Sequence, residues 1–84
     1  MIYTQPLSEL FHPEWRPLGL ACFEVASENK AEETDTQALA NTAEKQAKEN
    51  FGLDTHIINA KIELIHDPFT DKAIMRITGD LYRE

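Results

Sequence analysis

The sequence predicts a small α+β domain, a strand-helix-strand-strand unit in which one helix covers one face of a three-stranded sheet. Apolar residues recur at helical spacing from about residue 36 to 51, and they alternate with polar residues over 56–66 and 73–82. Gly52 lies where the spacing changes, and glycine is favoured directly after a helix. With 84 residues the chain forms one domain with a small core.

A short N-terminal arm, residues 1–17, precedes the single α+β domain of residues 18–84. Its large apolar side chains are Ile2, Tyr3, Leu7, Leu10, Phe11 and Trp15. Leu7, Leu10 and Phe11 have the spacing of one helical turn, which Pro13 would end. So much apolar area needs cover, so the arm either packs on its own domain or docks on a neighbouring subunit.

The first strand is expected at Leu18–Val25 and is apolar on both sides. Leu18, Leu20 and Cys22 share one face, and Ala21, Phe23 and Val25 share the other. One helix covers only one face of a sheet, so the arm or a second subunit must cover the other. The acidic residues 27–34 that follow are expected to form a solvated loop.

The helix is expected to begin near Thr34–Thr36, because Thr34 and Gln37 fit a capping box. Leu39, Ala43, Ala47 and Phe51 lie on one face and are predicted to meet the sheet. The first and second strands are expected to be parallel neighbours through a right-handed crossover. The last two strands should pair as an antiparallel hairpin through Asp67–Asp71.

Alternation in the second strand places six residues on the core face: His56, Ile58, Ala60, Ile62, Leu64 and His66. In the last strand the inward set is Ala73, Met75, Ile77, Gly79 and Leu81. The predicted core residues are Leu20, Phe23, Ile58, Ile62, Met75 and Ile77. The far face of the sheet keeps several apolar groups, which predicts contact between subunits.

Charge excludes some partners. The net charge is −7 and the eight basic residues are scattered, so no nucleic acid partner is expected. No apolar run approaches the ~20 residues that span a bilayer, and no membrane partner is expected. We expect a cytoplasmic protein that forms a homo-oligomer, with a basic protein as a further possible partner.

A metal site is the most specific chemistry that the residues allow. Zinc and copper prefer Cys and His ligands, and the chain offers Cys22, His12, His56 and His66. His56 and His66 are ten residues apart on one strand, about 33 Å along its axis, and cannot share an ion within one subunit. A site would need Cys22 with one histidine, or ligands from two subunits around a symmetry axis, and the candidate ligands are Cys22 and His56. The competing interpretation makes Cys22 a buried small hydrophobe and His56 a partly exposed residue at a strand start.

No enzyme is expected. A nucleophile such as Cys22 needs a base within hydrogen-bond reach, and no spacing in the chain implies one. Gly19, Gly52 and Gly79 stand alone, so there is no phosphate-binding loop and no cofactor can be named.

Several segments resemble the YbjQ-like family. They are the opening Met1–Thr4, the strand start Leu18–Leu20, the helix end Phe51–Asp54 and the closing 75–83. The resemblance implies a small α+β fold, a ring-shaped homo-oligomer and the heavy-metal binding for which the family is labelled. The chain is shorter than the family pattern between first strand and helix. Dodecins, flavin-binding shells of similar strand order, are an analogue by architecture alone.

Two functions remain open at this point. The first is a non-catalytic homo-oligomeric assembly or protein-interaction module. The second is a binder of a small ligand or heavy metal, with a site at a subunit interface.

Overall fold

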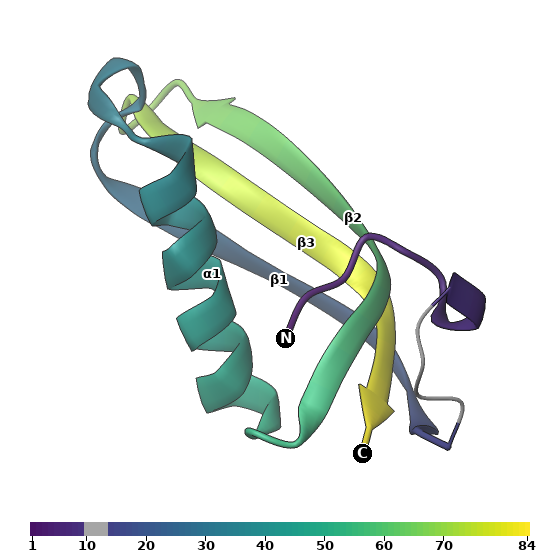
Figure 1. Cartoon of the computed structure of the whole chain (residues 1–84). Helices are drawn as coiled ribbons and strands as arrows, with labels where there is room; N and C mark the ends of the chain where they lie inside the picture. Colours follow the sequence, from purple (N-terminus) through teal and green to yellow (C-terminus); the bar gives the residue numbers. More distant parts are fainter. Residues whose placement is uncertain (10–13) are drawn as a thin grey trace.

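The computed structural model describes residues 1–9 and 14–84, and only the main chain of Glu33 (Figure 1). Its elements are the 3-10 turns η1 (Leu7–Glu9) and η2 (Ala31–Glu33), the helix α1 (Thr36–Phe51), and the strands β1 (Arg16–Lys30), β2 (Thr55–Asp67) and β3 (Lys72–Arg83). The strands form one open sheet, and α1 lies along one face of it. The predicted α+β fold and its strand-helix-strand-strand order are confirmed.

The strand order corrects one prediction. β3 lies between β1 and β2 and pairs antiparallel with both, so β1 and β2 run parallel but are not neighbours. The short turn after β2 brings β3 back beside it, and β3 then takes the place next to β1. The crossover through α1 therefore skips one strand.

Local sequence signals predicted the position of α1 correctly and its N-cap to within one residue. The N-cap is Asp35, one residue after the expected Thr34, and its carboxylate accepts a hydrogen bond from the Gln37 amide at 3.0 Å. Gly52 ends the helix at φ 103°, a conformation that suits glycine. The expected loop at 27–34 is wrong, because β1 continues to Lys30. Ser27 is buried there and accepts a hydrogen bond from the Ala73 amide at 3.0 Å.

The core lies between α1 and the strands β1 and β3. Its buried members are Ala21, Val25, Leu39, Ala43, Ala47, Ile57, Ala60, Met75 and Ile77, with Phe23 and Phe51 packed against them. Met75 and Ile77 confirm the predicted core. Leu20 and Ile62 were wrongly assigned, since they are 86% and 45% exposed. Leu20 lies on the face away from α1. Ile62 lies in the second half of β2, beside the cavity that separates this part of the strand from α1.

A β-bulge divides β2 into two halves. In the first half the odd-numbered residues face α1, and in the second half the even-numbered residues do. The register with β3 shifts between Ile58 and Lys61, and Asn59 adopts φ 55°, a left-handed conformation that asparagine tolerates. Before the bulge, His56 and Ile58 lie opposite Tyr82 and Asp80 and face away from α1. The expected continuous alternation is therefore wrong for His56 and Ile58, and Ile57 takes their place in the cluster under α1. Ile58 is buried as predicted, but on the other face of the sheet.

Gly79 makes room for this bulge. A Cβ atom added at Gly79 would lie 2.6 Å from Cγ2 of Ile57, 3.0 Å from the Ile58 carbonyl oxygen and 3.1 Å from Cα of Ala60. Two of these atoms belong to the main chain and cannot rotate away. The bulge and the glycine therefore form one packing unit.

The N-terminal arm adds to the outer edge of β2. Residue Ile2 pairs in parallel with Ile57, and hydrogen bonds of 2.8–2.9 Å join Met1, Tyr3 and Gln5 to Ile57, Asn59 and Ala60. The Ile2 amide also donates to the Glu44 carboxylate of α1 at 2.9 Å. Burial lowers the pKa of the Met1 amino group, which donates to the Thr55 carbonyl. Within one chain, the described part of the arm covers its own domain.

Substitution of Gly79 by Ala should destabilise the domain by about 1–3 kcal/mol, because the added methyl group overpacks the bulge. Urea unfolding followed by circular dichroism measures the change. Thr78→Ala, one residue away on the opposite face, is the control and should change stability by less than about 0.5 kcal/mol. Equal stability of Gly79→Ala and the wild type would contradict the close packing described here.

The hairpin between β2 and β3 carries a pH-dependent contribution to stability. Asp67 accepts hydrogen bonds from the Phe69 amide at 3.0 Å and the Thr70 hydroxyl at 2.8 Å, and these bonds lower the pKa of its carboxyl group below its ordinary value of 3.8. The ionised form is thus favoured by folding. Its stabilisation is present above the unfolded-state pKa and is lost as the pH falls through the lower, folded-state pKa.

Asp67→Asn should therefore be less stable than the wild type near pH 7, and this difference should shrink as the pH falls below about 4. Urea midpoints at a series of pH values measure it. Glu49→Gln, on the exposed side of α1, is the control and should show no such gap at pH 7. A gap for Asp67→Asn that is constant with pH would show that the effect has another origin.

Candidate functional site

Cys22 lies in the middle of β1, opposite Thr78 of β3, on the face of the sheet that α1 leaves uncovered. We call this side the open face. The thiol is free and the residue is exposed. The interpretation of Cys22 as a buried small hydrophobe is therefore wrong, and the thiol is accessible from solvent.

His56 lies on the same open face but near the start of β2, and its side chain is only 9% exposed. Its Nε2 atom lies 2.7 Å from the Glu84 carboxylate. Its Nδ1 atom is buried, and the described residues supply no hydrogen-bond partner for it. His56 is thus a buried residue, not the partly exposed one that its position suggested.

Two aromatic residues of the N-terminal segment enclose His56. The Trp15 ring stacks on the imidazole, with centroids 4.0 Å apart and planes 9° apart, and the Tyr3 ring lies 5.9 Å away. Tyr3 and Trp15 also contact each other at 6.1 Å. Ile58, on the same face, is 1% exposed. Helix α1 is on the other side of the sheet, so the helix does not account for the burial of Ile58.

The structure does not bring Cys22 and His56 together within one chain. Their partners on β3, Thr78 and Tyr82, are four residues apart, or about 13 Å, and β3 separates the two strands by a further ~10 Å. Bonds from zinc to sulfur and nitrogen are about 2.0–2.3 Å long, so one ion cannot reach both. A site using both residues would need a second subunit, and that proposal stays a prediction.

The other two metal candidates are also placed. His66 is exposed and lies 2.6 Å from the Asp71 carboxylate across the hairpin turn. His12 lies outside the described residues. Over residues 1–9 and 14–84, no three His, Cys, Asp or Glu side chains gather closely enough to hold an ion.

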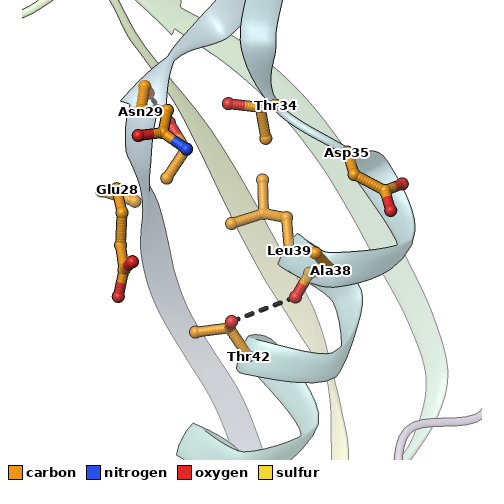
Figure 2. Close-up of a pocket in the computed structure, with 9 residues that line it drawn as sticks. Glu28, Asn29, Thr34, Asp35, Ala38, Leu39 and Thr42 are labelled. Atoms are coloured by element: carbon orange, nitrogen blue, oxygen red, sulfur yellow. Dashed lines mark hydrogen bonds between the residues drawn. The ribbon is translucent and has the colours of Figure 1, made fainter.

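One cavity of about 340 Å³ lies between the end of β1 and the start of α1. Figure 2 shows Leu39 directed into it from the helix, with Glu28 and Asn29 along one wall and Thr34 above. The polar groups around it have structural roles. The Thr34 hydroxyl donates to the Lys30 carbonyl at 2.9 Å, the Thr42 hydroxyl donates to the Ala38 carbonyl at 3.0 Å, and Asp35 caps the helix. This arrangement provides shape but no charge pair for a ligand.

A second cavity, of about 550 Å³, lies between α1 and the uncovered part of β2. Ala40, Ala43, Ile62, Met75 and Ile77 give it apolar walls, and Gln37, Asn41, Glu44 and Lys48 form its helical rim. Met1 and Ile2 of the arm also line it, and Figure 1 shows the N-terminus between α1 and the sheet. It follows from the position of α1 over β1 and β3, which leaves a groove beside β2.

The largest exposed apolar feature on a strand lies on β1. This strand is at one side of the sheet, and its outer edge pairs with none of the described residues. We call the outer side of residues 16–30 the free edge. Leu20 is 86% exposed and Leu18 is 45% exposed. Cys22 follows Leu20 on the open face, so apolar groups and unpaired main-chain groups occur together.

Comparison of the chain with protein-family models, with curated proteins and with solved structures found no match. The resemblance to the YbjQ-like family therefore stays a prediction. Among the described residues, no helix has the length and apolarity needed to cross a bilayer.

Sequence reasoning missed the residues that surround His56. Glu84 is 28 positions away and Trp15 lies in the arm, so no local spacing connects them to His56. The Asn59 bulge was the available signal, because an asparagine inside an alternating strand is a poor strand former. Recognition of the bulge would have moved His56 to the open face, within reach of the arm.

Loss of the Trp15 ring should uncover His56. We expect Trp15→Ala to lower stability by about 1–3 kcal/mol, since a partly buried aromatic stack is removed, whereas Trp15→Phe should retain most of the stability. Urea unfolding followed by circular dichroism measures both variants. A Trp15→Ala protein as stable as the wild type would mean that the arm does not protect this end of the sheet.

Proposed function

We propose that this protein is a non-catalytic homo-oligomeric module and that its subunits meet at the free edge of β1. One observation carries the proposal: β1 is a long outer strand with unpaired main-chain groups and with Leu20 86% exposed beside them. Such an edge is a template for pairing with another strand, and monomeric proteins usually cover or charge it.

The contrast between the two sides of the sheet supports the proposal. At the β2 side, the arm hydrogen-bonds to Ile57, Asn59 and Ala60 and covers the first half of the strand. The second half of β2 leaves Ile62 and Leu64 45% and 57% exposed, but it places the charged residues Lys61 and Glu63 between them, and such charges discourage pairing. None of the described residues pairs with the outer edge of β1, and the charged side chain in the middle of this strand is Glu24, which lies 3.7 Å from Arg76.

The uses of the titratable groups support a non-catalytic role. His66 pairs with Asp71 in the hairpin, Glu44 accepts from the Ile2 amide, and Asp67 stabilises the turn. His56 is enclosed by Trp15 and Glu84. Each of these contacts has a structural role in the domain.

A metal or small ligand bound between subunits is the second candidate function. It is favoured by the exposed thiol of Cys22 on the open face and by the buried Nδ1 atom of His56. The native mass of protein purified without chelator separates the two candidates. A mass equal to a whole number of chains supports the assembly module, and additional mass matching a metal or small molecule supports the ligand binder.

Leu20→Lys should convert the oligomer to a 9.6 kDa monomer, because it places a charge at the free edge. Light scattering coupled to gel filtration measures the mass. Folding stability of the chain should change by less than about 0.5 kcal/mol, as expected for an exposed site.

Leu53→Lys is the matched control, because Leu53 is 82% exposed and lies in the turn after α1, far along the chain from β1. It should leave the oligomeric mass unchanged. A wild-type protein that is a monomer at all concentrations would overturn the proposed function. Loss of assembly in both variants would show that the subunit contact cannot be assigned to the free edge of β1.

A further inference from the structure

We infer that the partner at the free edge is a second copy of this chain, whose β1 pairs antiparallel with the first and whose Cys22 lies directly opposite Cys22. This inference rests on the proposed function and specifies its contact. It predicts a continuous six-stranded sheet made from the three strands of each copy.

Symmetry restricts the possible registers. Two antiparallel copies of one strand are related by a two-fold axis perpendicular to the sheet, so one residue faces its own counterpart at the centre. Directly opposed residues share a face of the sheet. Every pairing centred on a residue of β1 therefore aligns the two open faces and places both helices on the other side.

We call the residue that faces its own counterpart the centre of the pairing. Regular backbone geometry favours a centre near residue 22. The pairing of β1 with β3 is regular from Gly19 to Ala26, and register shifts occur on both sides of that stretch. If Cys22 is the centre, residues 19–25 of one copy lie opposite residues 25–19 of the other, and all of them belong to the regular stretch. A centre at Leu20 would use only residues 19–21 in this way, and the pairing would run into the shift after Pro17.

Charge and the extent of the regular stretch disfavour the neighbouring registers. A centre at residue 24 places Glu24 against itself, and a centre at 23 places Arg16 opposite Lys30. A centre at 21 uses only residues 19–23 of the regular stretch. Like charges directly opposite each other on paired strands are destabilising.

A centre at Cys22 opposes unlike charges instead. Arg16 of one copy comes near Glu28 of the other at both ends of the pair. These residues lie beyond the regular stretch, so their contribution is attraction between the strand ends. Leu20 comes opposite the aliphatic part of Glu24 and diagonal to Cys22 of the second copy, which covers its exposed side chain.

The thiol of Cys22 provides a direct test, because opposed residues on paired strands lie about 4.5–5.5 Å apart at Cα, within the range that a disulfide spans. The full chain is treated with diamide, which accepts two electrons and two protons as two thiols form one disulfide. Non-reducing electrophoresis should show wild-type protein mostly at twice the chain mass, and Cys22→Ser should remain at the chain mass.

The double variant Leu20→Cys with Cys22→Ser is the matched control for collisions in solution, because Leu20 is itself 86% exposed. With the centre at Cys22, the two introduced thiols would lie about 13 Å apart along the paired strands and should not crosslink. Crosslinking of this variant in place of the wild type would move the centre to residue 20 and overturn the inferred register.

Mass measurement under reducing conditions separates this inference from the proposed function. An oligomeric wild type that forms no Cys22 crosslink overturns the β1 register and leaves the assembly module standing. A monomeric wild type that crosslinks no faster than the Leu20→Cys, Cys22→Ser control overturns both. Both the inferred register and the proposed function are supported if the wild type is an oligomer and crosslinks, whereas the Leu20→Cys, Cys22→Ser variant does not.

Discussion

The fit of the β2 bulge against Gly79 controls the arrangement of the whole sheet. Asn59 turns into a left-handed conformation, and the main chain at Ile58 and Ala60 approaches the glycine too closely for any Cβ. This reverses the facing of the first half of β2. Ile57 enters the core under α1, and His56 and Ile58 go to the open face.

The reversal explains why the N-terminal arm is where it is. A histidine on a face without a helix needs cover, and Trp15 and Tyr3 supply it through aromatic contacts with the imidazole. The same segment pairs with the β2 edge through main-chain hydrogen bonds. One arm thus satisfies both an apolar face and the main-chain groups of an edge strand.

Among residues 1–9 and 14–84, no comparable segment pairs with the outer edge of β1. Helix α1 packs on the inner side of β1 through residues such as Leu39 and Ala43, and the outer edge and the open face around Leu20 remain exposed. For a chain of 84 residues, whose core is necessarily small, burial against a second copy is an efficient source of further stability. The proposed contact at β1 follows from this asymmetry between the two edges.

Local sequence determined the elements of this protein. The spacing of Leu39, Ala43 and Ala47, the glycine after the helix and the alternation around Met75 and Ile77 each act within a few residues, so they could be read without a structure. The strand order and the surroundings of His56 could not. They depend on contacts between residues far apart in the chain, the bulge against Gly79, Trp15 on His56 and β3 between β1 and β2, and only the folded chain decides among such pairings.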